Sequence, residues 1–229
     1  MTTIDHTSLD KLAEHAIGLV KSGMTIGLGT GRAASAFIRA LGARRIDVRG
    51  IATSLASEEL ARQCRIELTT LGEAGKIDID FDGADEVDPR LNLIKGYGGA
   101  LVREKIVAAA SKRVVILVGA EKLVKRLGAH RRLPIETLPF ARDYVARRLR
   151  PLGLKARDRL NGDGSEFLSD NGNPILDCAV GDIRNPARLD REVRQIPGVV
   201  GTGLFVGMTD MVLVAPSDGN PVRVLRRKR

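Results

Sequence analysis

Hydrophobic positions in the first half of the chain follow two alternating spacings. Apolar residues at helical spacing occur in 9–20, 37–41 and 57–64, and short apolar runs lie between these segments. Strands that alternate with helices are typical of a parallel sheet covered on both faces. The pattern predicts a doubly wound, mostly parallel, Rossmann-like α/β domain. Its expected strands are 25–28, 48–52, 66–68, 77–81 and 114–118.

The pattern changes near Gly128. The expected order is then strand, helix, strands, helix, strand, which fits a small α+β domain of ferredoxin-like type. We expect residues 1–128 plus 205–229 to form the large domain, and 129–204 to form the small domain and provide an oligomer contact. The predicted strands are 133–137, 154–157, 166–169, 174–178 and 199–204, the helices are 141–149 and 186–196, and a last strand, 211–214, is expected to return to the large sheet.

Composition excludes several classes of protein. With 229 residues and 43% hydrophobic residues, the chain can bury a substantial core. No apolar run approaches the length of about 18 residues that a membrane helix needs, and the polar start is unlike a signal peptide, so we expect a cytoplasmic protein. Cys64 and Cys178 form no CxxC pair, which favours reduced thiols packed in the interior. The three histidines are scattered and predict no metal site.

The net charge of +9 is unevenly distributed. Residues 120–160 hold 12 Lys or Arg and 4 Asp or Glu, and 223–229 hold 5 basic and no acidic residues. A nucleic-acid surface would combine such basic patches with stacking aromatic side chains, but the chain has no Trp, two Tyr and five Phe. The basic segments also alternate with Leu and Val at helical spacing. We therefore expect solvated helix faces rather than a nucleic-acid partner.

The segment 77–105 concentrates acidic residues, lysines and glycines. Alternating apolar residues at 77, 79 and 81 predict a strand with one apolar face, and Gly83 then places Asp82 and Asp85 beyond its carboxyl end. Ligands of open α/β sheets bind at that end. Lys95 follows the apolar pair Leu93-Ile94. Glu104 lies in the helix that follows the glycine-rich loop. These four groups can converge on one small polar substrate.

Calcium binding is an alternative interpretation of the acidic cluster. Asp78, Asp80, Asp82 and Gly83 match the first half of a calcium loop. The bidentate glutamate that closes such a loop would fall at Pro89, which has no side-chain ligand. A solvated strand end is the other simple interpretation, but it explains neither Lys95 nor the glycines.

Gly27-Leu28-Gly29-Thr30-Gly31 follows a strand and begins a helix. Backbone N–H groups in this setting can hold a phosphate, although a plain tight turn would have the same sequence. The loop is not GxGxxG, and Thr53-Ser54 end the second strand where a dinucleotide site needs an acidic residue. A nicotinamide cofactor is therefore not expected.

Glu104 is the candidate general base. Its helical neighbours Leu101, Val107 and Ala108 are apolar, and a carboxylate in apolar surroundings suits proton abstraction. A routine ion pair with Arg103 or Lys105 is the competing interpretation.

Six ordered motifs resemble those of type A ribose-5-phosphate isomerase. They are GLGTG, DGADEVD, KGYGGALVREK, LPIETLPFAR, DNGNPILD and PGVVGTGLF, and they span most of the chain, from about residue 27 to residue 210. The resemblance implies an aldose–ketose isomerase of the pentose phosphate pathway that needs no metal or cofactor. It also implies a doubly wound large domain, a small α+β domain, and a homodimer or homotetramer.

The resemblance assigns roles to matching positions. Glu104 resembles the base that moves a proton between carbons 1 and 2 through an enediolate. Asp82, Asp85 and Lys95 resemble groups that assist ring opening and stabilise charge on the substrate oxygens. The substrate-binding positions that it implies are Thr30, Gly31, Arg32, Ala33, Gly83, Ala84, Gly96, Tyr97, Gly98 and the phosphate-binding Lys122.

Two departures from the family pattern affect the expected site. The phosphate loop reads Thr-Gly-Ser-Thr in the family but Thr30-Gly31-Arg32-Ala33 here, so a guanidinium would replace two hydroxyl donors. Tyr97 occupies a usual glycine position. If that residue has positive φ, its side chain costs about 1 to 2 kcal/mol and narrows the pocket.

Two other functions remain open at this stage. The chain could isomerise a different aldose phosphate with the same acid–base set. It could also be a non-catalytic sugar-phosphate-sensing domain, like the effector domains of repressors that share this fold. Such repressors need a helix-turn-helix module, and only about 24 residues precede the first strand.

Overall fold

The computed structural model describes residues 5–130, 132–216 and 220–227. Contacts between residues divide the chain into two compact units. The first unit consists of Met1–Ala84, Arg103–Leu123 and Gly207–Arg229, and the second consists of Asp85–Val102 and Val124–Val206. The segment 85–102, which the sequence pattern assigned to the large domain, groups with the second unit.

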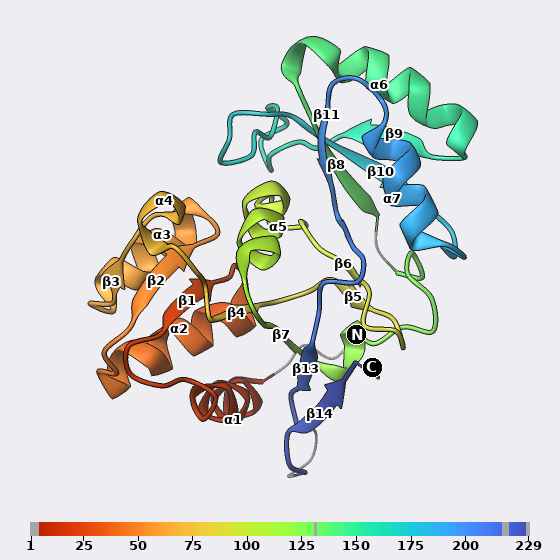
Figure 1. The fold of residues 1–229 in the computed structure, drawn as a ribbon. Helices are drawn as coiled ribbons and strands as arrows, with labels where there is room; N and C mark the ends of the chain where they lie inside the picture. Colours follow the sequence, from red (N-terminus) through yellow and green to blue (C-terminus); the bar gives the residue numbers. More distant parts are fainter. Residues whose placement is uncertain (1–4, 131, 217–219, 228–229) are drawn as a thin grey trace. The chain divides into compact units, whose positions relative to one another are not determined.

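The first unit is built on a seven-stranded, mostly parallel sheet (Figure 1). The strand order is β14-β13-β7-β4-β1-β2-β3, in which β13 and β14 pair antiparallel. Residues 211–214 return to this sheet as predicted, with Met211 opposite Val115. The strands are β1 Thr25–Leu28, β2 Arg49–Ala52, β3 Glu67–Leu68, β4 Ile79–Asp82, β7 Val114–Val118, β13 Met211–Val214 and β14 Arg223–Arg226.

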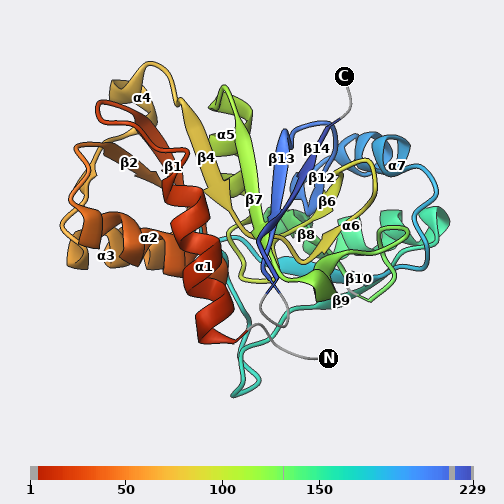
Figure 2. The ribbon, with the colours of Figure 1, turned by 90° about the horizontal axis from the view of Figure 1, so that it is seen from below.

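Helices cover both faces of this sheet, which confirms the predicted doubly wound fold (Figure 2). On one face, α1 (His6–Ile17), α2 (Arg32–Arg44) and α3 (Leu55–Gln63) enclose the main core, where the ring centroids of Phe37 and Phe81 lie 4.2 Å apart. On the other face, Val107 of α5 (Leu101–Ala110) packs with Ile51 and Ile77, next to α4 (Leu71–Ala74).

Two helices begin earlier than the sequence pattern indicated. The first helix begins at His6, because the backbone N–H of Ser8 donates to Oδ1 of Asp5 at 2.7 Å and Asp5 is the cap. Helix α3 begins at Leu55 because Ser54 and Ser57 form a reciprocal capping box. In both cases the cap lies before the first residue of the apolar pattern, 9 and 57, so the pattern alone placed the start of the helix too late.

Strand β4 corrects a second expectation. The alternation of apolar residues at 77, 79 and 81 predicted one apolar and one solvated face, but all four residues of β4 are buried. Because β4 lies between β1 and β7, both of its faces are covered. Asp80 and Asp82 are therefore buried acids, with exposed fractions of 0% and 1%.

The second unit contains a four-stranded antiparallel sheet in the order β11-β8-β10-β9. With two helices in the order βαββαβ, this is the ferredoxin-like arrangement that the sequence predicted. The predicted strand 166–169 does not form. That segment makes the isolated bridges Leu160–Glu166 and Leu168–Pro174, and Pro174 has no N–H to extend a ladder. The elements are β8 Leu133–Thr137, α6 Arg142–Leu149, β9 Lys155–Asp158, β10 Ile175–Ala179, α7 Pro186–Arg194 and β11 Val199–Thr202, with 3₁₀ turns at Pro139–Ala141 and Arg150–Leu152.

A three-stranded antiparallel sheet completes the second unit. Its order is β12-β6-β5, with β12 Leu204–Phe205, β6 Leu93–Ile94 and β5 Glu86–Val87. All six of these residues are buried. Strand β6 leads directly into Lys95 and the glycine-rich loop. None of the helices in the described part of the chain is long and apolar enough to span a membrane.

Candidate active site

In the first unit, the predicted site residues lie at the carboxyl edge of the parallel sheet. Strands β1, β4 and β7 are adjacent, and Thr30 and Lys122 lie just after β1 and β7. Asp82 is the last residue of β4, not the first residue beyond it as the sequence pattern predicted. From β1 the chain moves to β2 and β3 in one direction, whereas β4, β7 and β13 lie in the other. The pair β1–β4 is therefore the switch point of the sheet, where open α/β sheets bind their ligands.

Gly27 and Gly29 permit close packing against β4 and α5. A Cβ atom at Gly27 would lie 2.7 Å from Cγ1 of Val107, and one at Gly29 would collide with Asp82. Gly31 has φ 101° and forms the cap of α2 without a side-chain hydrogen bond. The first N–H groups of this 13-residue helix are thus left for another acceptor, as in a phosphate site.

The side chains of this loop differ in their surroundings. Thr30 is half-buried, and its Oγ1 lies 3.0 Å from Oγ1 of Thr53 and 2.8 Å from Oγ of Ser54, at the end of β2. Arg32 is exposed and makes no ion pair with any described residue, and Ala33 is half-buried. The guanidinium of Arg32 is therefore available to a ligand at the start of α2.

Asp82 is held by backbone donors. Its Oδ1 accepts hydrogen bonds from the N–H of Thr30 at 3.0 Å and of Gly83 at 2.7 Å. A Cβ atom at Gly83 would lie 3.5 Å from the carbonyl oxygen of Thr30, so this position lies against the β1 loop. Ala84 follows and is half-buried. The carboxylate is thus fixed in orientation at the switch point.

Glu104 lies in the first turn of α5 and is 4% exposed. Val107, one turn later, packs over Gly27, whose partner in β4 is Asp80. Because α5 ends just before β7 begins, its first turn points to the carboxyl edge of the sheet, and Glu104 lies closer to that edge than Val107. Val107 and Ala108, two apolar neighbours of Glu104 on the helix, are 2% and 5% exposed.

Lys122 ends a 3₁₀ turn, Ala120–Lys122, directly after β7. Its backbone N–H donates to the carbonyl of Gly119 at 3.1 Å, and Lys122 is half-buried. The described residues include no ion-pair partner for its ammonium group. Lys122 therefore brings a positive charge to the edge that carries Thr30 and Asp82.

In the second unit, Asp85 is hydrogen-bonded to the short loop that follows Lys95. The half-buried Asp85 accepts a hydrogen bond at Oδ2 from the N–H of Tyr97, at 3.0 Å. Lys95 is 3% exposed, and its Nζ lies 5.5 Å from the ring centroid of Phe205. The carboxylate of Asp85 and the buried ammonium group of Lys95 thus both belong to the second unit.

The loop 96–99 owes its shape to two of its glycines. Gly96 has φ 97° and Gly99 has φ 90°, and a Cβ atom at Gly96 would lie 2.6 Å from Cβ of Leu101. The backbone of Tyr97 does not have positive φ, so its side chain carries no left-handed strain. Tyr97 and Gly98 are both exposed.

Sequence reasoning missed two kinds of contact around these residues. Thr53 and Ser54 contact Thr30, and their place at the end of β2 could have indicated it. Arg159 donates to the carbonyls of Gly96 and Tyr97, and no local pattern connects residues more than 60 positions apart. Among the described residues, no group of three or more His, Cys, Asp or Glu side chains is placed to hold a metal ion.

Comparison with known proteins identifies relatives over nearly the whole chain. The sequence profile described as Ribose 5-phosphate isomerase A (phosphoriboisomerase A) matches residues 49–219. The ribose-5-phosphate isomerase A of Roseiflexus sp. is 46% identical over 220 residues, which cover 94% of each chain.

Two solved structures share the fold. Ribose 5-phosphate isomerase A from Methanocaldococcus jannaschii is 41% identical and has a TM-score of 0.92, covering 97% of this chain and all of that one. A D-ribose-5-phosphate isomerase in complex with phospho-erythronic acid is 34% identical, with a TM-score of 0.93 over 98% of this chain and all of that one. The extent of these matches shows that the chain belongs to the ribose 5-phosphate isomerase A family.

Proposed function

We propose that this chain interconverts D-ribose 5-phosphate and D-ribulose 5-phosphate through an enediolate, with Glu104 as the base. Family membership supports the reaction. The burial of Glu104 at the carboxyl edge of the sheet supports its role, because a desolvated carboxylate is a stronger proton acceptor than a solvated one. In this reaction Glu104 takes the proton from carbon 2 of the aldose and returns it to carbon 1. The hydroxyl proton on the oxygen of carbon 2 passes to the oxygen of carbon 1, which yields the ketose.

Three further side chains are proposed to act on the substrate oxygens. Negative charge develops on the carbonyl oxygen as the enediolate forms, and the ammonium group of Lys95 would stabilise it. Asp82 and Asp85 would assist ring opening by exchanging protons with the ring oxygen and the hydroxyl at carbon 1. Their fixed carboxylate orientations support these roles, because such transfer needs a preset geometry.

The phosphate is proposed to bind at the start of α2. The observation that carries this proposal is the uncapped N-terminus of α2 beside Asp82 at the switch point of the sheet. Gly31 and Ala33 would supply N–H donors, the side chain of Thr30 would line the loop, and Arg32 and Lys122 would supply positive charge. One solved relative is a complex with phospho-erythronic acid, and we infer that a small phosphorylated sugar fits this chain as well.

Glu104→Gln tests the reaction and its base together. The amide keeps the size of the side chain but cannot accept the proton, so we expect kcat to fall on the order of 10² to 10⁴-fold with little change in KM. Glu121→Gln is a matched control, since this half-buried glutamate precedes Lys122 outside the proposed acid–base set. Near wild-type kcat in Glu104→Gln would contradict the assignment of the base.

An isomerase for a different aldose phosphate is the second candidate. Arg32 and Ala33 favour it, because they replace the family's hydroxyl donors at the phosphate end. Comparing kcat/KM for ribose 5-phosphate with values for tetrose and hexose phosphates separates the two. A higher value for a tetrose or hexose phosphate would assign the chain to that sugar. The pentose phosphate pathway is the proposed metabolic setting of the first candidate.

The chain is further proposed to act as a cytoplasmic homodimer or homotetramer, without nucleic-acid or membrane partners. Its two cysteines are free, as expected in a reducing compartment. The second unit exposes Phe140 completely and Leu138 and Tyr144 by 50% and 40%, which suits a contact between copies. Light scattering of wild type and Phe140→Ser measures the oligomer, and a monomeric wild-type protein would contradict the assembly.

A further inference from the structure

Arg159 is a buried arginine directly after β9, in the second unit. It is 9% exposed. Its Nε and Nη2 donate to the two carboxylate oxygens of Asp177 on β10, at 2.9 and 2.5 Å. Its Nη1 donates to the carbonyl oxygens of Gly96 and Tyr97, at 2.8 and 3.0 Å. One side chain thus joins the four-stranded sheet to the loop that follows Lys95.

The same loop is fixed at its other backbone groups. The N–H of Lys95 donates to the carbonyl of Gly203 at 2.9 Å, and that of Gly99 donates to the carbonyl of Gly96 at 3.0 Å. The N–H of Tyr97 donates to Asp85. Consequently, Arg159 holds the carbonyl side of residue 97 while Asp85 holds its N–H side.

We propose that Arg159 is a positioning residue, which sets the loop so that Asp85 and Lys95 keep a fixed relation to each other. The inference rests on the proposed catalytic roles of these two side chains. An ion pair that only joined β9 to β10 would need the two donors that face Asp177. The third nitrogen, Nη1, points instead to two adjacent loop carbonyls, which the planar guanidinium can reach while it holds the carboxylate.

Two aromatic rings lie next to the guanidinium. Its central carbon lies 5.7 Å from the ring centroid of Tyr97 and 5.5 Å from that of Phe167. Tyr97, which replaces the usual glycine of the family motif, therefore adds a cation–π contact to the clamp. An open cavity of about 550 Å³ borders Tyr97, Arg159, Phe167 and Asp177, so small solutes can reach the pair.

Arg159→Lys is the central test. Lysine keeps the charge but cannot bind a carboxylate in bidentate fashion and two carbonyls at once. A loop displaced by about 1 Å should lower kcat on the order of 10-fold to 100-fold, whereas KM, which depends on the phosphate end, should change by less than about threefold. Hydrogen exchange at the amides of Tyr97 and Gly99 should accelerate.

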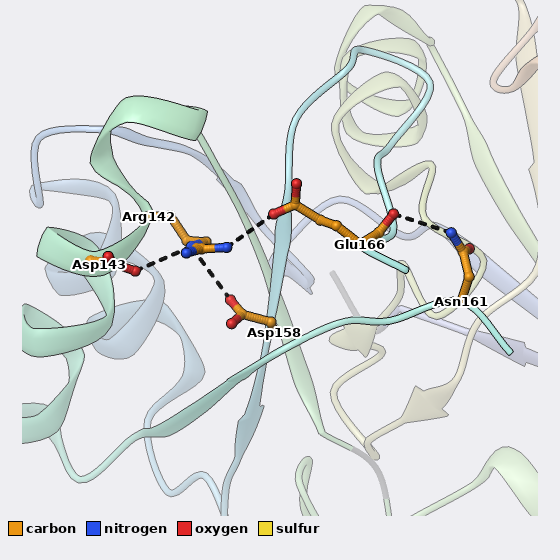
Figure 3. Close-up of polar contacts among 5 residues, drawn as sticks. All are labelled: Arg142, Asp143, Asp158, Asn161 and Glu166. Atoms are coloured by element: carbon orange, nitrogen blue, oxygen red, sulfur yellow. Dashed lines mark hydrogen bonds and ion pairs between the residues drawn. The ribbon is translucent and has the colours of Figure 1, made fainter. Parts of the chain in front are cut away.

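Arg142→Gln is the matched control in the same unit. Arg142 is partly exposed and contacts Asp143 at 3.1 Å, Asp158 at 3.7 Å and Glu166 at 3.1 Å, none of which belongs to the loop (Figure 3). Its loss should lower thermal stability without changing kcat or loop exchange. A purely structural role for Arg159 predicts that both variants lose activity only in proportion to their folded fraction.

Guanidinium rescue supplies a specific signature. Added guanidinium ion at millimolar concentration should restore part of the kcat of Arg159→Ala through the open cavity, whereas ammonium ion should not. The proposal is overturned if folded Arg159→Lys keeps kcat within about twofold of wild type, or if loop exchange is unchanged in it. Lys95→Met tests the underlying role separately. Full activity in that variant would refute the role of Lys95, while faster loop exchange in Arg159→Lys would still establish the clamp.

Discussion

The backbone N–H of Thr30 donates a hydrogen bond to Oδ1 of Asp82, at 3.0 Å, and so ties the loop after β1 to the end of β4. The same oxygen accepts from Gly83, which leaves the carboxylate little freedom to rotate. Asp82 therefore has two separable properties. Its acceptor oxygen shapes the proposed phosphate loop, and its charge and proton serve the proposed chemistry.

Asp82→Asn and Asp82→Ala should separate these properties. Asparagine can keep Oδ1 as the acceptor for Thr30 and Gly83, so its KM should stay near wild type while kcat falls on the order of 10² fold. Alanine removes the acceptor as well and should raise KM in addition, because the loop loses its support. Steady-state kinetics with ribose 5-phosphate provide the measurement. Equal KM values in the two variants would show that this hydrogen bond does not shape the phosphate site.

Arg32 is where the proposed phosphate loop departs from its family. If its exposed guanidinium binds the phosphate, Arg32→Ala should lower kcat/KM by roughly 10-fold to 150-fold, chiefly through KM, since a charge-assisted bond contributes about 1.5 to 3 kcal/mol. Arg32→Ser combined with Ala33→Thr should recover much of the loss. Arg39→Ala, on an exposed position of the same helix, is the control. An unchanged KM at fixed ionic strength would place the arginine outside the phosphate site.

The sequence predicted best those elements that are buried throughout. Strands 25–28, 133–137 and 211–214 have the predicted bounds. A short apolar run between turn residues is typical of a buried strand, and the turn residues mark both of its ends. The small edge strand β14 and the four-residue helix α4 were not predicted. Helix α4 has no buried residue, so it leaves no apolar stripe to detect.

The candidate site was predictable where it follows strand ends. Thr30 and Lys122 follow strands of the parallel sheet and Asp82 ends one. The rule that ligands bind at the carboxyl ends of such strands requires only the order of elements. The clamp of Arg159 on residues 96 and 97 was not predictable, because its partners are backbone carbonyls distant in sequence. The burial of Asp80 was also missed, since alternation alone does not distinguish a central strand from one with a solvated face.

The two cysteines should differ in reactivity. Burial raises the pKa of Cys178 to about 12, and the charge of Asp177 adds to this effect, so almost no thiolate forms there at pH 8. Cys64 is half-buried. A disulfide reagent should therefore modify Cys64 in the native protein and both thiols after unfolding, as read by mass spectrometry of the peptides. Modification of Cys178 in the folded protein would contradict the buried position of this side chain.

Asp78 should make stability depend on pH in the acid range. Its Oδ1 accepts from Nζ of Lys112 at 2.7 Å and its Oδ2 from the N–H of Thr25 at 3.0 Å. The hydrogen bond from Lys112 first, and that from Thr25 second, lower the pKa of Asp78 below its ordinary value of 3.8. A lowered folded-state pKa stabilises the protein above the unfolded pKa, and this contribution is lost as the pH falls through the folded value.

Asp78→Asn should therefore destabilise the protein at pH 7 and have a smaller effect near pH 3. Because the side chains of Lys112 and Asp78 are 57% and 30% exposed, solvent screening limits the effect at pH 7 to roughly 0.5 kcal/mol, or about 1 to 2 °C in Tm. Thermal unfolding at both pH values, with Lys112→Met and the double variant, isolates the pair from the bond to Thr25. The coupling free energy between the two substitutions should also be smaller in 1 M salt, because the Debye length falls from about 10 Å at 0.1 M to about 3 Å at 1 M. A destabilisation by Asp78→Asn that is the same at pH 7 and pH 3 would mean that the carboxylate stabilises the fold through its shape and neutral hydrogen bonds rather than its charge.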